Sequence, residues 1–228
     1  MFPKGLIVSS QALAGNPMRN TEKLVSMAEA AAIGGASALR VNGADCVREL
    51  SKRVNVPIIG INKVTDETGR TVITPTFALA KEVVDAGARI VALDGTFYPS
   101  SIKEDLKGLI EKIHSLGAMV MADISTAEEA EMAVLCGADA VSTTLAGYIP
   151  GALHTDNELY IPNYEIIKEI VDKKLSATLV AEGRFWSPDD VVKAFKIGAD
   201  AVVIGKAITN PMAITKYFMA KIKEGMAK

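Results

Sequence analysis

The sequence predicts an α/β fold, a single (β/α)8 barrel of the TIM type, and two features of the chain support this fold class. Eight short runs of apolar or small residues alternate with segments of helical periodicity. The phrases GGASALRV, AGARIVAL, CGADAVST and IGADAVVI also reuse one joint, in which a glycine precedes a new apolar run. Alternating strands and helices across 228 residues are typical of one barrel domain, which we expect to span residues 1–228.

The predicted strands are short and nearly continuous in apolar or small side chains, as parallel strands buried on both faces should be. In chain order they are GLIVSSQA (5–12), SALRVNG (37–43), PIIGINK (57–63), RIVALDG (89–95), AMVMADIS (118–125), AVSTTLAG (140–147), ATLVAEGR (177–184) and AVVIGKAI (201–208). The apolar run near the N-terminus is too short to predict a signal peptide, so we interpret it as the first strand.

The segments between the strands repeat apolar residues at three and four positions, which indicates amphipathic helices. Clear examples are residues 21–35, 102–117 and 188–198. Glycines that favour the left-handed backbone just past a helix precede most strands, at Gly35, Gly87, Gly117, Gly137 and Gly198. Ser-x-x-acid capping boxes predict helix starts at Ser125 and Ser187, and Pro211 predicts the start of the last helix.

An open, doubly wound sheet is the alternative fold. Such a sheet would usually carry a glycine-rich dinucleotide turn after its first strand, and SSQALAG is not one. Two connections are longer than a barrel needs, at residues 64–75 after the third strand and 148–162 after the sixth. Because extra loop length is most useful at the catalytic end of a barrel, we expect both to cover or wall a pocket there.

Composition excludes several functional classes. The net charge of −2 and the pI near 5.8 give no footprint for nucleic acid or a membrane surface. No apolar segment reaches the ~18 residues that a membrane helix needs. Cys46 and Cys136 have no paired spacing, so we expect reduced thiols in a cytoplasmic protein. His114 and His154 have no spaced partner that would indicate a metal site.

Polar residues close nearly every predicted strand. They are Gln11, Arg40, Lys63, Asp94, Asp123, Thr143 with Thr144, Glu182, and the pair Gly205 and Lys206. Barrel enzymes place their chemistry at the carboxyl ends of the strands, so this ring predicts an active site. Each residue alone also has a structural interpretation: Asp123 could cap the next helix, and Arg40 could pair with a neighbouring strand.

Lys63 and Glu182 are the predicted catalytic pair. A lysine that ends an apolar strand in a closed pocket would have a lowered pKa and could serve as a base near neutral pH. A carboxylate across the barrel mouth could move protons to sugar oxygens or to carbon. A plain Lys63–Glu182 ion pair without chemistry remains the structural alternative.

The loops after the seventh and eighth strands predict a phosphate site. Barrels often bind phosphate there through backbone N–H groups. Gly183 and Gly205 would let the backbone approach an anion, and Arg184 or Lys206 could add charge. Both glycines could instead serve only as tight turns.

The order of these motifs resembles the N-acylglucosamine-6-phosphate 2-epimerase family, which acts on N-acetylmannosamine 6-phosphate. The resemblance covers nearly the whole chain, and ADIST, VSTTLAGY and AEGR are its specific pieces. It implies an isomerase of sialic acid catabolism that uses no metal and no redox cofactor and commonly forms a homodimer. Its substrate would be a small sugar phosphate.

The resemblance also implies roles for single residues. Lys63 and Glu182 would be catalytic. Gln11, Arg40 and Asp123 would contact the sugar, and the loops that hold Gly183, Arg184, Gly205 and Lys206 would bind the phosphate. Many relatives have Arg before the proline of AIT-x-P where this chain has Asn210, and often a second glycine where it has Lys206.

Other functions stay open at this stage. Lys63 could form a Schiff base with a carbonyl, as in a lyase. The pocket could also belong to a phosphosugar-binding sensor without turnover, or to an isomerase of another phosphosugar. Whether one base or two invert the carbon, and which group opens the sugar ring, the sequence does not decide.

Overall fold

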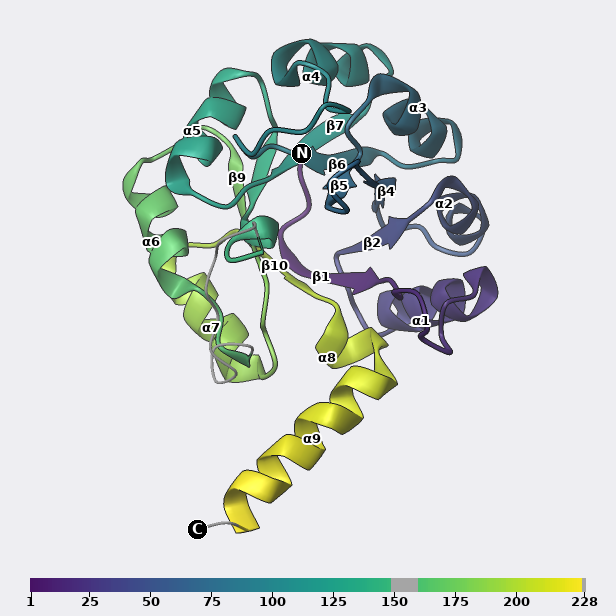
Figure 1. Ribbon diagram of the computed structural model, residues 1–228, viewed down its shortest axis with the longest axis vertical. Helices are drawn as coiled ribbons and strands as arrows, with labels where there is room; N and C mark the ends of the chain where they lie inside the picture. Colours follow the sequence, from purple (N-terminus) through teal and green to yellow (C-terminus); the bar gives the residue numbers. More distant parts are fainter. Residues whose placement is uncertain (149–159, 227–228) are drawn as a thin grey trace.

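Within residues 1–148 and 160–226, which this computed structural model describes, eight parallel strands close into a barrel (Figure 1). The ring order is β1, β10, β9, β8, β7, β6, β3, β2. The bounds are β1 Gly5–Ser10, β2 Ala38–Asn42, β3 Ile58–Ile61, β6 Ile90–Asp94, β7 Met119–Asp123, β8 Ala140–Ser142, β9 Thr178–Glu182 and β10 Ala201–Ile204. All eight predicted strands are confirmed, and the closed ring excludes the open-sheet alternative.

Helices surround the strands as the periodicity predicts (Figure 1). The helical segments of the described residues are α1 Thr21–Ile33, α2 Ala44–Ser51, α3 Phe77–Asp85, α4 Leu106–Ser115, α5 Ala127–Leu135, the 3-10 turn η1 Thr143–Leu145, α6 Tyr164–Asp172, α7 Pro188–Ile197, α8 Lys206–Thr209 and α9 Pro211–Met226. The apolar stripes of the surrounding helices pack on the outer faces of the strands, where Leu39, Val91 and Val120 are fully buried. No helix in the described part of the chain has both the length and the apolar character that crossing a bilayer demands.

The joints between helices and strands follow local chemistry. The five glycines expected to adopt the left-handed backbone all do so, with φ between 78° and 127°. Ser187 caps α7 in the predicted capping box with Asp190. The box expected at Ser125 is wrong by one residue, because Thr126 is the N-cap of α5 and Glu129 is its partner. Both positions match the Ser/Thr-x-x-Glu pattern, which alone cannot choose between them.

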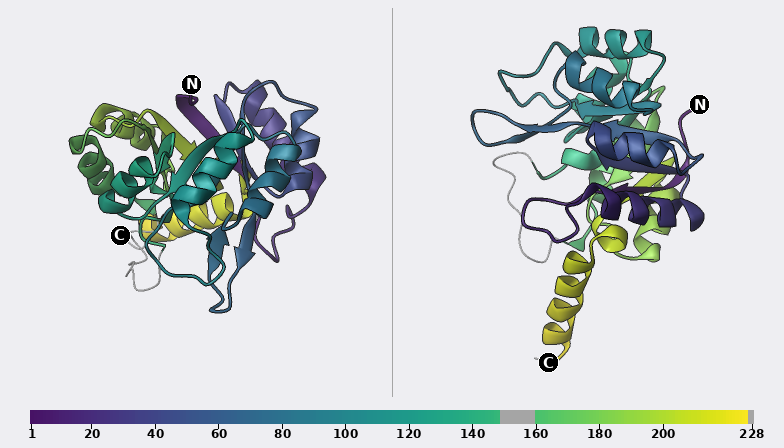
Figure 2. Two further views of the ribbon diagram at one scale, coloured as in Figure 1. Left: turned by 90° about the horizontal axis from the view of Figure 1, so that it is seen from above. Right: turned by 90° about the vertical axis from the view of Figure 1, so that its right-hand side faces the viewer.

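The long connection after β3 is a hairpin rather than an irregular loop. β4 (Lys63–Thr65) and β5 (Thr71–Ile73) pair antiparallel around a turn at residues 66–70. This hairpin and the loop after β1 project from the same end of the barrel (Figure 2, right). The hairpin therefore stands at the carboxyl end of the strands, where extra loop length was expected. Of the other long connection, residues 149–159 lie outside the described residues, and His154 lies among them.

The last helix does not cover the barrel. After the short α8, α9 begins at Pro211 as predicted and runs away from the ring of helices (Figures 1 and 2). Tyr217 near its middle stacks on Trp186 of the loop after β9, with ring centroids 4.7 Å apart. No residue within Pro211–Met226 is buried.

Candidate active site

Alternation along the strands explains why polar groups gather at one end of the barrel. The interior cluster contains Ile7, Ala38, Ile59, Ile61, Ile90, Ala92, Met121, Ala140, Val180, Ala201 and Val203. Because successive side chains of a strand point to opposite faces, every second residue continues this interior layer. Two residues further along stand Ser9, Arg40, Lys63, Asp94, Asp123, Ser142, Glu182 and Gly205. The apolar interior thus ends in a polar layer at the carboxyl ends of the strands.

Arg40 is the centre of this layer. Its side chain is 1 % exposed, and its two Nη atoms lie 3.2 Å and 2.5 Å from the two carboxylate oxygens of Asp123. Nη1 also donates to Glu182 Oε2 and, at 3.0 Å, to Thr144 Oγ1. Asp123 therefore does not cap the following helix, and Glu182 is paired with Arg40 rather than with Lys63. Arg40 thus holds two carboxylates in one buried cluster.

Thr144 belongs to the same cluster. Its hydroxyl donates to Asp123 Oδ1 at 2.6 Å and lies 3.0 Å from Glu182 Oε2. Thr144 was predicted at a strand end, without a role in the site. Thr144 lies in the 3-10 turn η1 beyond the end of β8, so the alternation of strand side chains does not predict where its hydroxyl points.

Lys63 stands two residues past the end of β3, as the first residue of β4. Its backbone N–H donates to Asn42 Oδ1 at 2.9 Å. Its side chain makes no hydrogen bond or ion pair with any of residues 1–148 or 160–226. In a ring of eight strands, β9 lies four places from β3, through β6, β7 and β8. Glu182 at the end of β9 is therefore on the side of the mouth opposite Lys63.

Burial and the neighbouring charges shift the pKa of Lys63. Desolvation and the charge of Arg40 lower the pKa of Lys63, and Lys206 lowers it further, while Glu182 and Asp123 raise it. Lys63 nevertheless has a solvent-exposed side chain. The ammonium group is thus surrounded by protein atoms but open to solvent through the mouth. The charges that act on Lys63 place all five groups around one mouth.

Asp123 and Arg40 of the cluster also have pKa values that differ from those of the free side chains. Burial raises the pKa of Asp123 to about 6, against the opposing effects of Arg40 and Thr144 and together with Glu182. Burial acts to lower the pKa of Arg40, but the charges of Asp123 and Glu182 outweigh it, so the net pKa is raised. Arg40 is thus a permanent cation, and Asp123 is ionised at neutral pH.

The predicted phosphate loops follow the neighbouring strands β9 and β10. A Cβ added at Gly183 would meet no atom within 4 Å, so its backbone borders open space. Arg184 has a left-handed backbone with φ 64°, which is uncommon outside glycine. Its guanidinium lies over the Tyr148 ring, and its Nη2 is 3.3 Å from the Ala146 carbonyl oxygen. Lys206 is exposed directly after Gly205.

Two further predicted positions lie near β1. Gln11 continues the interior face of β1 beyond Ser9, and its Nε2 donates to Ser9 Oγ at 2.8 Å. Asn210 joins two loops, because its Oδ1 accepts from Asn16 Nδ2 at 3.2 Å and from the Ala213 N–H at 3.0 Å. The asparagine thus serves a local structural purpose where an arginine was expected from the family resemblance.

A closed (β/α)8 barrel with an acid–base cluster at the carboxyl ends of its strands defines the class of protein: a barrel enzyme whose residues can move protons. Comparison with known proteins gives the family. Residues 24–224 match the family model described as "Putative N-acetylmannosamine-6-phosphate epimerase". This match covers most of the chain, and the chain belongs to that family.

Individual relatives agree with this assignment. A protein of Caldanaerobacter subterraneus subsp. tengcongensis is named "Putative N-acetylmannosamine-6-phosphate 2-epimerase". It is 44 % identical to this chain, over 96 % of this chain and 92 % of its own length. One of Cutibacterium acnes with the same name is 42 % identical over 94 % and 92 %. The solved structure of the N-acetylmannosamine-6-phosphate 2-epimerase from Clostridium perfringens is similar with a TM-score of 0.88 and 37 % identity, over 95 % of this chain and 92 % of the other.

Proposed function

We propose that the protein is an isomerase that interconverts N-acetylmannosamine 6-phosphate and N-acetylglucosamine 6-phosphate in sialic acid catabolism. The reaction removes and returns the proton at C2. The observation that carries the proposal is that Lys63 and Glu182 stand at the same mouth of the barrel, close enough for the charge of Glu182 to act on Lys63. The chain also belongs to the epimerase family. The two sugars differ only in the configuration at the carbon that such a pair would flank.

Proton transfer at C2 needs an open sugar ring. In the open chain C2 is next to the aldehyde, and the carbanion left by deprotonation spreads onto the carbonyl as an enolate. Lys63 takes the C2 proton in this proposal. A base must be unprotonated, and the lowered pKa of Lys63 increases its neutral fraction near neutral pH. Its side chain, without a partner in the described parts of the chain, is available to the substrate.

Glu182 is the candidate for the opposite face of the sugar. Its place across the mouth from Lys63 suits a second acid that returns the proton from the other side. A single-base route, in which the intermediate turns over Lys63, uses the same residues. Glu182→Gln separates the two routes: with two bases, one epimer still exchanges its C2 proton but does not convert, whereas with one base conversion continues.

Arg40 has a different task from direct contact with the enolate. Its Nη atoms are already engaged by Asp123, Glu182 and Thr144. We therefore assign to Arg40 the holding of Glu182 and the lowering of the pKa of Lys63. Asp123 and Gln11, which lie in the same mouth, are the candidates for contact with the sugar hydroxyls.

The phosphate end of the substrate would lie at the loops after β9 and β10. Gly183 and Gly205 offer backbone N–H groups, while Lys206 and Arg184 bring positive charge. These loops lie beside the cluster that contains Glu182, so a phosphate held there fixes the sugar relative to the catalytic pair. Binding energy from this remote group would orient C2 for reaction.

Proton NMR of N-acetylmannosamine 6-phosphate with the protein in heavy water tests the proposal. We expect signals of the gluco epimer together with loss of the C2 proton signal. Lys63→Ala should neither form the gluco epimer nor exchange the C2 proton. Lys81→Ala should do both, because Lys81 only forms an exposed ion pair with Asp85 of α3. A folded wild-type protein that produces no gluco epimer would contradict the function. Borohydride added during turnover should leave no adduct on Lys63, because the route contains no Schiff base.

We also infer that the protein is a homodimer whose two copies associate through α9. The helix leaves apolar side chains exposed: Met212, Phe218, Met219, Ile222 and Met226. These side chains are close to one another along one helix, and contiguous apolar surface of this kind marks an interaction site. A second copy of the chain carries the same surface and so offers a self-complementary contact.

A cytoplasmic location is part of the same proposal. Cys46 and Cys136 are free thiols, and Cys46 is buried. Free cysteines are typical of proteins kept in a reducing compartment. Location of a fluorescently tagged protein in its cell would check this inference.

A further inference from the structure

The hairpin β4–β5 carries Lys63 at its base and is attached to the barrel at both ends. At the base, the Thr74 N–H donates to the Asn62 carbonyl oxygen at 2.8 Å, and the Asn62 N–H donates to Thr74 Oγ1 at 3.0 Å. Each strand has only three residues. A two-stranded hairpin is marginally stable by itself, so its position depends on what its turn contacts.

Arg70 supplies the main contact of the turn. Its Nη2 lies 2.5 Å from Asp94 Oδ2 and 3.2 Å from Thr96 Oγ1. The guanidinium also lies over the Tyr98 ring, 4.6 Å from its centroid. Arg70 is 9 % exposed, and the Asp94 side chain is fully buried. A buried, multiply bonded arginine holds its backbone far more firmly than an exposed ion pair does.

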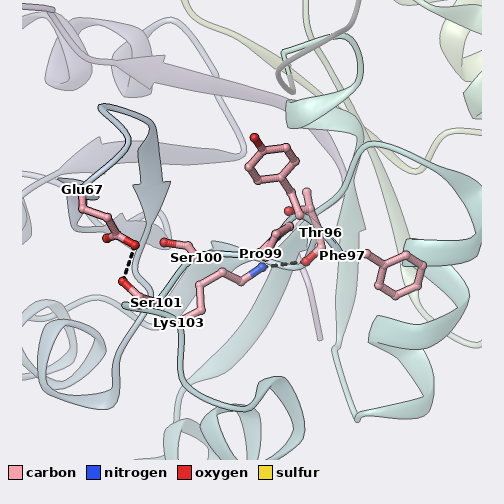
Figure 3. A pocket seen from close by; sticks show the side chains of 8 residues that line it. Glu67, Thr96, Phe97, Pro99, Ser100, Ser101 and Lys103 are labelled. Atoms are coloured by element: carbon pink, nitrogen blue, oxygen red, sulfur yellow. Dashed lines mark hydrogen bonds between the residues drawn. The ribbon is translucent and has the colours of Figure 1, made fainter.

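Two weaker contacts accompany Arg70. Ser100 Oγ donates to Asp66 Oδ2 at 2.9 Å. Ser101 Oγ donates to Glu67 Oε1 at 2.6 Å (Figure 3). They join the turn to the loop between β6 and α4, beside a cavity of about 620 Å³ lined by residues 96–101, Glu67 and Lys103. The hairpin and this loop therefore form one connected unit over the β6 side of the mouth.

We propose that Arg70 is a positioning residue for Lys63. Its ion pair with Asp94 holds the hairpin against the barrel, and this fixes where the unpartnered Lys63 side chain lies. The inference rests on the proposed role of Lys63 as the base at C2. In this proposal Arg70 acts through the hairpin and not through contact with the sugar. The phosphate loops belong to β10 and β9, and β10 is four places from β6 in the ring, so Arg70 and the phosphate site are on opposite sides.

Loss of the anchor has two consequences for Lys63. The ammonium group moves relative to C2, and a displacement of about 1 Å can cost roughly 100-fold in rate. Fewer protein atoms also surround it once the hairpin is released. Because desolvation is the largest cause that lowers the pKa of Lys63, its pKa then rises. The charges that face Lys63 from other elements, Arg40, Glu182, Asp123 and Lys206, stay in place.

Kinetics of Arg70→Ala test the geometric consequence. We expect kcat to fall roughly 10- to 100-fold with KM little changed, because the phosphate loops are distant. The rising limb of kcat/KM against pH should move to higher pH. Arg70→Lys, which keeps the charge on Asp94 but loses the fork to Thr96, should lie between wild type and Arg70→Ala.

Chemical labelling tests the inference without relying on activity. The rate at which an acylating reagent modifies Lys63, followed against pH by peptide mass spectrometry, reports the pKa of this one amine. Its midpoint should move to higher pH in Arg70→Ala and Arg70→Lys. If Lys63→Ala keeps C2 exchange, Lys63 is not the base at C2, and if wild type makes no gluco epimer, the proposed function fails. In both cases the labelling curve still decides whether Arg70 positions Lys63.

Lys103→Ala is the matched control. Lys103 Nζ also binds Asp94, at 3.0 Å, but Lys103 belongs to the loop before α4 and not to the hairpin. Its removal should leave the Lys63 labelling curve near that of wild type. An unchanged curve and kcat in Arg70→Ala, or an equal shift in Lys103→Ala, would overturn the proposal.

Discussion

Asp94 and Asp123 lie side by side at the ends of β6 and β7, and each is bound by a different arginine. Arg40 reaches Asp123 from β2, while Arg70 reaches Asp94 from the hairpin turn. Two adjacent buried carboxylates would repel each other, so each needs its own cation. The pairs also divide the work: one builds the acid–base cluster, and the other holds the segment that carries Lys63.

Removal of Arg40 should destabilise the fold strongly. Arg40→Ala leaves the fully buried Asp123 without its cation, and breaking a buried pair in this way costs about 3 to 5 kcal/mol. Urea denaturation measures the loss. Arg53→Ala is the control, because Arg53 pairs with Glu22 and Glu29 on the surface and its removal should change stability little. A loss in Arg40→Ala no larger than in the control would contradict this account of the cluster.

The free energy of unfolding should depend on the titration of Asp123 between about pH 4 and pH 6. Burial raises the pKa of this carboxyl to about 6 in the folded state, above the ~3.9 expected when unfolded. As pH rises through this window, the unfolded chain loses the proton first, so this group makes the free energy of unfolding decrease. Its stabilising contribution is complete below the unfolded pKa and is lost as pH passes the folded pKa.

Two variants isolate that titration. The free energy of unfolding is measured at successive pH values for each protein. In Asp123→Asn, the decrease between about pH 4 and pH 6 that Asp123 causes should be absent. Thr144→Val should move the slope to higher pH, because the Thr144 hydrogen bond lowers the pKa of Asp123. The same slope in wild type and Asp123→Asn would show that another group titrates there.

Much of the site was predictable because two regularities act together. Strand side chains alternate with a period of two, and barrel strands present their carboxyl ends at one mouth. Arg40, Asp123 and Glu182 therefore had to converge once the strands were recognised, and the structure brings them together. Their pairing was not predictable, because strand periodicity does not show which carboxylate a long side chain will reach. The Lys63–Glu182 ion pair, which was the structural alternative, does not form among the described residues, and Glu182 pairs with Arg40 instead.

Local patterns were less decisive for the connecting segments. Residues 64–75 were predicted only as a long connection, although β-branched residues flank a turn that contains Gly69. Arg70 was not predicted as a site residue, because nothing in the sequence around it indicates a partner on β6. Likewise, an amphipathic pattern in α9 predicts a covered face but does not say which molecule covers it.

Lys206 should matter mainly for binding of the phosphate. If its ammonium group contacts the phosphate, Lys206→Ala removes a charged hydrogen bond of about 1.5 to 3 kcal/mol, which is roughly a 10- to 100-fold increase in KM. Steady-state kinetics with N-acetylmannosamine 6-phosphate measure this increase. With the sugar lacking the phosphate, the variant and wild type should have the same KM. Equal losses with both sugars would place Lys206 away from the phosphate.

Phe218→Glu should separate the proposed dimer into monomers. Phe218 is 59 % exposed on α9, next to Met219 at 50 % and near Ile222 at 49 %. A carboxylate at this position would have to be desolvated in a contact between two copies of α9, and that cost opposes association.

Light scattering coupled to size exclusion measures the mass at several protein concentrations. Lys81→Glu is the control, because it places the same side chain on an exposed position of α3, away from α9, and should leave the dimer intact. A wild-type protein that is a monomer at all concentrations would contradict the dimer. A Phe218→Glu protein that remains dimeric would place the contact elsewhere on the molecule.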